Sequence, residues 1–539
     1  MAACSPPLLY LRRAAISPPP ALLPPPPPPP PPPSIAAISA ALRPLCLSRR
    51  SAELDRALSA FTRAAPKPSP FLYNSLIRSL NRAGLPRRSL SMFLLMLHDP
   101  ATVPDSFTYP FALKACAQLA ALDVGEQIHG LLLKAAVLSP DEGGDVVPLY
   151  NALIHMYIQC DRIDRALEVF DRSPARNVVS WNSMIDGFAK SEDMDSAREL
   201  FEDMPERNMV SWNSMIGGYA NNGRPDEALT LFLQSQELGL CPDEVTMVNV
   251  LAAISDLGLL DSGEEAHAYI TRRGLSMRSG ALGVSLVSMY SRCGSIEAAH
   301  RLFEGIPDKN VAHWTAMITG LAAHGIAEGA LQLFAEMLRS GVKPNHVTFM
   351  AILSACSHGG LVEEGLKLLQ LMATHGVDPR RQHLSCAVDL LARAGLVEES
   401  LALALAGAHP GEAEPAVWTS LLSASLRRGN SGVAEIAASR LMNLDPDQGA
   451  SYVLLSNVYA SLGRWDEFSR MRKTMARRGV EKVPGLSWIV VGGAVHEFAM
   501  GDKLHRRQKE IYATLSAMES HLRWVDPPGV DLEMLGPPT

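Results

Sequence analysis

The sequence lacks both the long apolar runs of a membrane protein and the clustered cysteines of a metal or disulfide scaffold. Its longest apolar candidate, residues 401–408, is far shorter than the roughly 18 residues that a membrane-spanning helix needs. The eight cysteines are scattered over 539 residues with no C-x-x-C pair, which predicts no metal centre and favours a reducing compartment. Aromatic residues make up only 6% of the chain, but hydrophobic residues make up 47%, as is typical of a soluble, core-forming protein.

The first 52 residues lack acidic residues and lysine, although they contain five arginines. A basic, acid-free start is typical of an organellar transit peptide, which we predict over 1–52, with a cytosolic proline-rich tail as the alternative. Residues 24–33 are an unbroken proline run, which favours an extended polyproline helix outside any core. Without these arginines, 44 basic residues face 56 acidic ones, a net charge of −12. Bulk charge therefore does not favour nucleic-acid binding, and any contact with RNA needs a local groove.

The remaining sequence is repetitive. Residues 178–208 recur from residue 209, so that Trp181 and Trp212 lie 31 residues apart, and the same frame returns at Trp314. Intervening segments of 35, 36 and 31 residues fill the gap. The pattern Ala-x-x-x-Phe stays in register with the tryptophans at Ala166/Phe170, Ala197/Phe201, Ala228/Phe232, Ala299/Phe303 and Ala330/Phe334.

Each repeat has the pattern of two amphipathic helices. In the repeat 178–208, Trp181, Met184, Ile185 and Phe188 form one apolar stripe at helical spacing, and residues 197–204 form a second. Neither helix can bury its stripe alone, so consecutive repeats must stack into an α-solenoid whose concave surface is lined by the first helices. A tetratricopeptide array, with its fixed period of 34 residues, does not fit the variable period.

This rotation of lengths, with these motifs, resembles the plant pentatricopeptide repeat (PPR) family, in the PLS subclass that mixes standard, long and short repeats. The resemblance implies an all-α, right-handed superhelix of tandem two-helix repeats. A partial repeat is expected over 53–69 and ten full repeats over 70–414. We number the ten repeats in order: 70–105, 106–146, 147–177, 178–208, 209–243, 244–279, 280–310, 311–345, 346–380 and 381–414.

Beyond the repeats, the sequence resembles the carboxy-terminal extension of PPR editing factors. Two further helical pairs over 415–482 resemble the E motif, and residues 483–522 resemble the additional E+ segment. Residues 523–539 are expected to form a tail. Within the E+ segment, residues 489–498 predict a β-hairpin that turns at Gly492 and Gly493.

Short polar side chains near the start of the first helix are suited to reading bases. Amides and hydroxyls hydrogen-bond to base edges while apolar neighbours sandwich the base, which predicts one base per repeat. The resemblance assigns this role to the fifth and closing residues of a repeat, and implies uracil for Asn/Asp, a pyrimidine for Asn/Asn and adenine for Thr/Asn. The predicted pairs are Asn74/Asp105, Asn151/Asn177, Asn182/Asn208, Asn213/Asp243 and Thr315/Asn345.

An alternative interpretation is that the fifth-position asparagines are only helix N-caps. Capping alone leaves the recurring Asp or Asn at the end of each repeat unexplained. Three repeats carry Pro110, Val248 and Met350 at the fifth position, which the family code reads poorly, and Val284 replaces a polar reader in a fourth. The last repeat has the unusual pair Ser385/Glu414.

No catalytic motif is found in the sequence. A cytidine deaminase needs H-x-E with P-C-x-x-C, because zinc activates a water and the glutamate moves its proton, but none of the fifteen histidines begins H-x-E. His496-Glu497 lacks the second histidine of a metalloprotease, since Met500 stands there. There is also no G-K-[ST] phosphate loop and no G-x-S-x-G elbow. We therefore expect a protein that is not an enzyme, with no cofactor and no metal.

Three functions remain open. The first is an organellar specificity factor for C-to-U RNA editing, which binds single-stranded RNA and recruits a DYW-type deaminase and other editing factors in trans through its extension. The second is a PPR protein for transcript stability, splicing or translation, and the third is a protein-binding scaffold. The leader suggests the mitochondrion, with the plastid as the alternative. No membrane association and no obligate homo-oligomer are expected.

Overall fold

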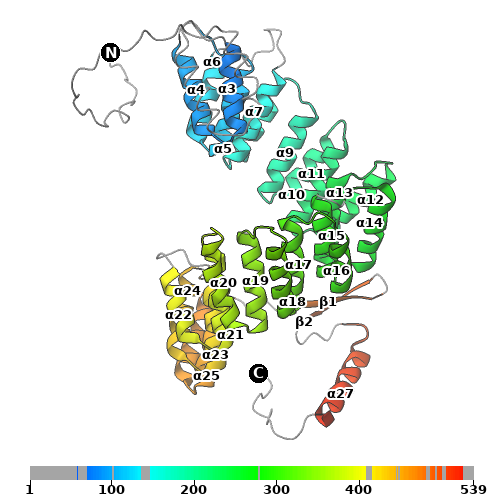
Figure 1. The fold of residues 1–539 in the computed structure, drawn as a ribbon, viewed down its shortest axis with the longest axis vertical. Helices are drawn as coiled ribbons and strands as arrows, with labels where there is room; N and C mark the ends of the chain where they lie inside the picture. Colours follow the sequence, from blue (N-terminus) through cyan, green and yellow to red (C-terminus); the bar gives the residue numbers. More distant parts are fainter. Residues whose placement is uncertain are drawn as a thin grey trace, which may run out of the picture. The chain divides into compact units, whose positions relative to one another are not determined.

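Helical pairs follow one another along almost the whole described chain (Figure 1). The computed structural model describes residues 58, 70–99, 102–134, 146–276, 280–407, 415–444, 446, 449–480, 486–491, 494–499 and 505–525. The predicted transit peptide, nearly all of the partial repeat at 53–69, residues 526–539 of the predicted tail and the turn at Gly492 and Gly493 lie outside these residues.

Every predicted repeat contains two helices. The first helices are α3 (Pro70–Arg82), α5 (Thr108–Leu119), α7 (Val147–Gln159), α9 (Val178–Lys190), α11 (Met209–Asn221), α13 (Glu244–Leu257), α15 (Ala281–Arg292), α17 (Val311–Ala323), α19 (His346–Gly359) and α21 (Arg381–Ala394). The second helices are α4 (Pro86–His98), α6 (Leu122–Lys134), α8 (Ile163–Arg172), α10 (Met194–Asp203), α12 (Pro225–Glu237), α14 (Leu260–Arg273), α16 (Ile296–Gly305), α18 (Ala327–Arg339), α20 (Val362–Thr374) and α22 (Val397–Gly407). All first helices except α5 and α15 begin at the first residue of a predicted repeat.

The helices are grouped into two compact units, Met1–Ala253 and Ile254–Thr539. Within each unit, a first helix packs against the second helix of its own repeat and against the first helix of the next repeat, as α7 packs on α8 and α9. In the second unit, α17 likewise packs on α18 and α19. This nearest-neighbour packing is the arrangement of a solenoid. The prediction of an all-α solenoid of two-helix repeats is confirmed.

The repeated alanines and aromatic residues form the core of each joint between repeats. The alanine of every Ala-x-x-x-Phe pair is fully buried, which lets the two helices of a repeat approach closely. Three phenylalanines meet the tryptophan of the next repeat edge to face, each an arrangement that contributes roughly 0.5–1.5 kcal/mol beyond burial. The ring centroids lie 5.0 Å apart in Phe170–Trp181, 4.9 Å in Phe201–Trp212 and 5.1 Å in Phe303–Trp314.

The extension continues the helical stack and then departs from it. Its helices are α23 (Pro415–Arg428), α24 (Ser431–Leu444), α25 (Gly449–Ser461) and α26 (Trp465–Arg477). α23 packs on α21 of the last repeat, and Trp418 lies in a core cluster that extends from Val388 to Tyr459. The two strands β1 (Leu486–Val491) and β2 (Ala494–Ala499) pair antiparallel with Ile489 opposite His496, as the hairpin prediction requires, and α27 (Gln508–Val525) follows.

Among the helices that the structure describes, none combines the length and apolar character that a membrane crossing requires.

Candidate functional site

Where the closing residue of a repeat is Asn or Asp, it caps the first helix of the next repeat. Asn177, with φ −103° and ψ 174°, accepts a hydrogen bond on Oδ1 from the backbone N–H of Ser180 at 3.0 Å. The Ser180 hydroxyl in turn accepts a bond from the Asn177 backbone N–H at 3.2 Å, which completes a capping box. Asn208 with Ser211 and Asn345 with Thr348 repeat this arrangement.

Aspartates play the same part at two other joints. Asp243 Oδ1 accepts from the Thr246 backbone N–H at 2.8 Å, and Asp105 Oδ1 accepts from the Thr108 backbone N–H at 2.9 Å. Helix capping therefore does explain the recurring Asn or Asp at the end of a repeat, contrary to the sequence-based interpretation. The reason is positional: the closing residue precedes the helix, whereas the fifth residue lies a full turn inside it.

Two fifth residues are buried within their first helices and pair with the closing residues of their own repeats. Asn74 Nδ2 donates to Asp105 Oδ1 at 2.9 Å, and Asn213 Nδ2 donates to Asp243 Oδ1 at 3.1 Å. Asn74 and Asn213 are each only 8% exposed. One aspartate oxygen thus receives both the capping bond and the amide of the fifth residue, so the two predicted readers of one repeat are held together.

The asparagine of the third repeat has a different bonding pattern. Asn151 Nδ2 donates to Asn177 Oδ1 at 3.2 Å, and Asn151 Oδ1 accepts from the Ser180 hydroxyl at 2.6 Å. Both functional atoms of Asn151 are therefore engaged within the protein, whereas in the Asn/Asp pairs only the amide nitrogen is.

Several fifth residues present an unsatisfied acceptor. Four buried amide oxygens have no hydrogen-bond partner among the described residues, and three of them, those of Asn74, Asn182 and Asn213, belong to fifth residues; the other belongs to Asn81. A buried polar atom without a partner costs about 1–3 kcal/mol. Such a cost, repeated at one position of the repeat, indicates a place where a ligand supplies the missing donor.

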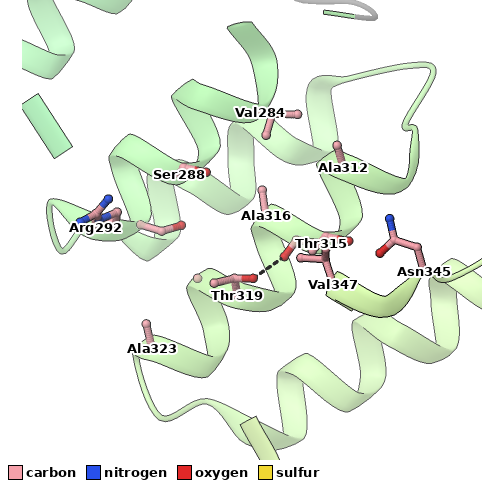
Figure 2. Close-up of a pocket in the computed structure, with 12 residues that line it drawn as sticks. Val284, Ser288, Arg292, Ala312, Thr315, Ala316, Thr319, Ala323, Asn345 and Val347 are labelled. Carbon is pink, nitrogen blue, oxygen red and sulfur yellow. Dashed lines mark hydrogen bonds between the residues drawn. The ribbon is translucent and has the colours of Figure 1, made fainter. Parts of the chain in front are cut away.

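The eighth repeat shows the space beside such a pair. Thr315 is 8% exposed; its hydroxyl donates to the Val311 carbonyl and contacts the Thr348 hydroxyl, both at 2.8 Å. Thr315 and Asn345 line a cavity of about 360 Å³ between α15, α17 and α19. Figure 2 shows Ala312 and Val347, the second residues of the eighth and ninth repeats, among the side chains that line this cavity.

The second residues of the repeats form an exposed apolar series that the sequence-based site did not name. An exposed apolar side chain at a fixed repeat position, with no core to fill, is suited to packing against a flat ligand. Numbering from the first residue of the repeat would have revealed them. They are Phe71, Phe107, Val179, Val210, Val245 and Val347, between 37% and 70% exposed.

Other repeats lack a polar reader. Pro110, Val248, Val284 and Met350 occupy the fifth position within α5, α13, α15 and α19 and bring no side-chain hydrogen-bonding group there. Ser385 bonds back to the Arg381 carbonyl of its own helix at 3.1 Å, and Glu414 lies outside the described residues.

Three basic side chains gather on neighbouring first helices of the first compact unit. Burial lowers the pKa of His155 on α7, and the positive charges of Lys190 on α9 and Lys114 on α5 lower it further. The three side chains therefore lie within electrostatic reach of one another. The lowered pKa of His155 favours its neutral form, so the positive charge here comes from Lys114 and Lys190.

The aspartate caps are held in the charged state. Burial would raise the pKa of Asp243, but the hydrogen bonds from Thr246 and Asn213 outweigh burial and leave that pKa below its ordinary value. Asp105 has a lowered pKa by the same balance of burial against bonds from Asn74 and Thr108. In the part of the chain that the structure describes, no group of three or more His, Cys, Asp or Glu residues could hold a metal ion.

Stacked two-helix repeats, three of which join a polar fifth residue to their closing residue, define a helical repeat protein of the α-solenoid class. Comparison with known proteins then gives the family. The PPR repeat family profile matches residues 176–210, 207–254 and 309–358, and the PPR repeat profile matches 71–99, 149–178, 284–311 and 347–377. The E motif profile matches 429–490, a span that overlaps the predicted 415–482.

Full-length relatives agree. Pentatricopeptide repeat-containing protein At2g20540 of Arabidopsis thaliana is 40% identical over 469 residues, which cover 87% of this chain and 86% of that protein. Two other Arabidopsis pentatricopeptide repeat-containing proteins carry an organelle in their names. The mitochondrial one is 38% identical over 84% of this chain and 65% of its own length, and the chloroplastic one is 40% identical over 86% and 82%.

The crystal structure of the pentatricopeptide repeat protein PPR10 from maize matches the fold with a TM-score of 0.52 at 17% identity. The match covers 83% of this chain and 70% of PPR10. The chain belongs to the pentatricopeptide repeat family and carries its E motif.

Proposed function

We propose that this protein binds single-stranded organellar RNA with one base per repeat and selects sites for C-to-U editing. The observation that carries the proposal is the series of fifth and closing residues, in which buried amide oxygens of Asn74, Asn182 and Asn213 lack a donor. Single-stranded RNA supplies such donors because its base edges are not paired with each other.

The pairing geometry supports a preference for uracil at the Asn/Asp repeats. Asn213 donates its amide N–H to Asp243, so its buried Oδ1, which has no donor among the described residues, is left only as an acceptor. Uracil offers an N3–H donor in the middle of its pairing edge, whereas cytosine has an acceptor there, so an accepting oxygen aligned with N3 favours uracil over cytosine. The same argument applies to Asn74 with Asp105.

The surroundings of the pairs are suited to the rest of a nucleotide. The exposed apolar second residues of consecutive repeats, such as Val179 and Val210, flank the space in which a base would lie. Lys114 and Lys190, on either side of His155 in the order of the first helices, supply positive charge for phosphates. These features provide the local groove that an acidic protein needs to bind RNA.

The extension supports editing in preference to simple RNA protection. The E motif match at 429–490 and the hairpin of β1 and β2, whose first strand lies at the end of that match, correspond to the extension expected of editing factors. Because the sequence contains no H-x-E deaminase motif, we assign recognition to this chain and the deamination to a DYW-type deaminase supplied by another protein. The protein itself is then a binding factor and not an enzyme, and the mitochondrion is the proposed compartment.

The test is sequencing of mitochondrial and plastid RNA from a plant that lacks the protein, complemented either with the wild type or with the triple variant Asn74→Val, Asn182→Val, Asn213→Val. We expect conversion to be lost at one or a few cytidines in one organelle and to return only with the wild type. If editing is intact but a transcript is shortened or unspliced, the result would favour a role in transcript processing over a role in editing. Unchanged RNA throughout would overturn the proposal.

A further inference from the structure

The 31-residue repeats end in a connector that the other repeats do not share. After a ten-residue second helix, the chain runs through a proline, one variable residue, a basic residue and the closing asparagine. The basic residues are Arg176, Arg207 and Lys309, each directly before a closing residue.

Each basic side chain folds back onto the end of the preceding helix. Arg176 Nε donates to the Phe170 carbonyl at 3.0 Å, and its second nitrogen donates to the Asp171 carbonyl at 3.2 Å. Arg207 binds the carbonyls of Phe201 and Glu202 in the same way. These carbonyls are the ones that a helix C-terminus leaves without intrahelical partners, and a cation there also complements the helix dipole.

A lysine performs the same task in the seventh repeat. Lys309 Nζ donates to the carbonyls of Glu304 at 3.2 Å and Ile306 at 2.8 Å. In all three connectors the cation also lies over the ring of the phenylalanine from the Ala-x-x-x-Phe pattern. The distances to the ring centroid are 4.4 Å for Arg176 over Phe170, 5.0 Å for Arg207 over Phe201 and 4.9 Å for Lys309 over Phe303.

The same phenylalanine contacts the tryptophan of the next repeat. Phe201 lies edge to face with Trp212, the fourth residue of the fifth repeat, while Asn208 caps the helix on which Trp212 stands. Arg207 therefore connects the end of α10 to the residue that precedes α11. It leaves the closing asparagine little freedom to move relative to either helix.

The 35-residue repeats build this connection differently. Their second helices are followed by a glycine in the left-handed region, Gly239 at φ +76° and Gly341 at φ +78°. A proline, Pro242 or Pro344, stands directly before the closing residue where the short repeats have a cation. Proline restricts the backbone at this point by its ring, so no side chain needs to be fixed.

We propose that Arg176, Arg207 and Lys309 are positioning residues that orient the closing asparagine of the short repeats, and that Arg176 and Arg207, whose repeats carry a polar fifth residue, thereby sharpen base discrimination there. The inference rests on the proposed function, because it assumes that the closing residue reads a base. The cation acts through the asparagine: its nitrogens are occupied by backbone carbonyls, and its charge faces the helix end.

The test compares Arg207→Gln, Arg207→Lys and the control Arg198→Gln. Arg198 lies on α10, the helix that Arg207 follows, and pairs with the exposed side chain of Glu202. For each protein, dissociation constants are measured for RNA oligonucleotides that differ only at the nucleotide facing the fourth repeat, which is located as the position where Asn182→Val changes the base preference. A second series varies the nucleotide facing the fifth repeat, and thermal unfolding is followed by circular dichroism.

We expect Arg207→Gln to reduce the ratio of best to worst base at the fourth repeat about fivefold, within the range a hydrogen-bonded base contact provides, and to leave the fifth repeat unchanged. Arg207→Lys should restore the ratio, as Lys309 implies, and Arg198→Gln should match the wild type. An unchanged ratio in Arg207→Gln, or an equal fall at both repeats together with a lower melting temperature, would overturn the inference. A wild type with no base preference at the fourth repeat would overturn the proposed function itself.

Discussion

The fifth and seventh repeats contain similar caps but different sites. In the fifth repeat, Asp243 caps the next helix and also receives the amide of Asn213. In the seventh repeat, Asn310 caps α17 through the backbone N–H groups of Ala312 and His313, but the fifth residue is Val284. The helix begins in the same way in both cases, and only one repeat has a polar pair.

This difference separates folding from recognition. The cap satisfies helix donors that every solenoid joint must satisfy, so it is required whether or not a ligand binds. The fifth residue caps no helix, and at Asn213 it leaves a buried oxygen without a donor. A residue that costs stability and recurs at one repeat position is expected to be retained for binding.

Removing the caps should give the largest effect. It should destabilise both repeats but change base discrimination only in the fifth. Asp243→Ala and Asn310→Ala are each expected to lower the local stability of the following helix by about 1–2 kcal/mol, the usual loss for an N-cap. Only Asp243→Ala should also abolish base discrimination at its repeat. Hydrogen exchange of the first-turn amides of α13 and α17, with binding to RNA varied at single positions, measures both effects. Loss of base discrimination in Asn310→Ala would contradict the distinction between residues that cap helices and residues that read bases.

Removing the fifth residue while keeping the cap should abolish base discrimination without affecting the helix start. Asn213→Val makes the fifth repeat resemble the seventh. Its stability should change by less than about 1 kcal/mol, because the lost bond to Asp243 is offset by the loss of the orphaned oxygen. The preference for uracil at this repeat should disappear. Urea unfolding and the same RNA series provide the measurement, and a strongly destabilised variant would show that Asn213 is structural.

Acidification should give the smallest effect and should distinguish aspartate caps from asparagine caps. The pKa of Asp243 and that of Asp105 are lowered in the folded protein, so their stabilisation is complete above the ordinary carboxyl pKa and is lost as pH falls through the lowered value. Asn345 does not titrate, so the cap on α19 should persist. Protection of the Thr246 amide should therefore fall at low pH before that of the Thr348 amide does. Equal loss at both amides would indicate global acid unfolding instead.

Much of the fold could be predicted because large, buried or half-buried aromatic residues recur at fixed positions of the repeat. The spacing of Trp181, Trp212 and Trp314 located the starts of the helices that carry them, since each tryptophan stands at a fixed place in the core of a joint. The fifth and closing positions followed from the same frame.

The chemistry of the joints could not be predicted in full. Sequence spacing does not show that Asn74 reaches Asp105 across 31 residues, or that one aspartate oxygen serves both a cap and an amide. For the same reason, the caps were placed on the wrong residues. The connector cations were overlooked because a basic residue in a short polar loop has no distinctive pattern until its carbonyl partners are known.

The central claim is that the fifth and closing residues together read one base. It is tested most directly by exchanging one pair for another: Asn213→Thr with Asp243→Asn gives the fifth repeat the residues found at Thr315 and Asn345. Binding is measured to RNA that carries each of the four bases at the facing nucleotide. The account predicts that the preference moves from uracil to adenine at that nucleotide and is unchanged elsewhere. A preference that remains uracil, or that weakens equally at every nucleotide, would contradict it.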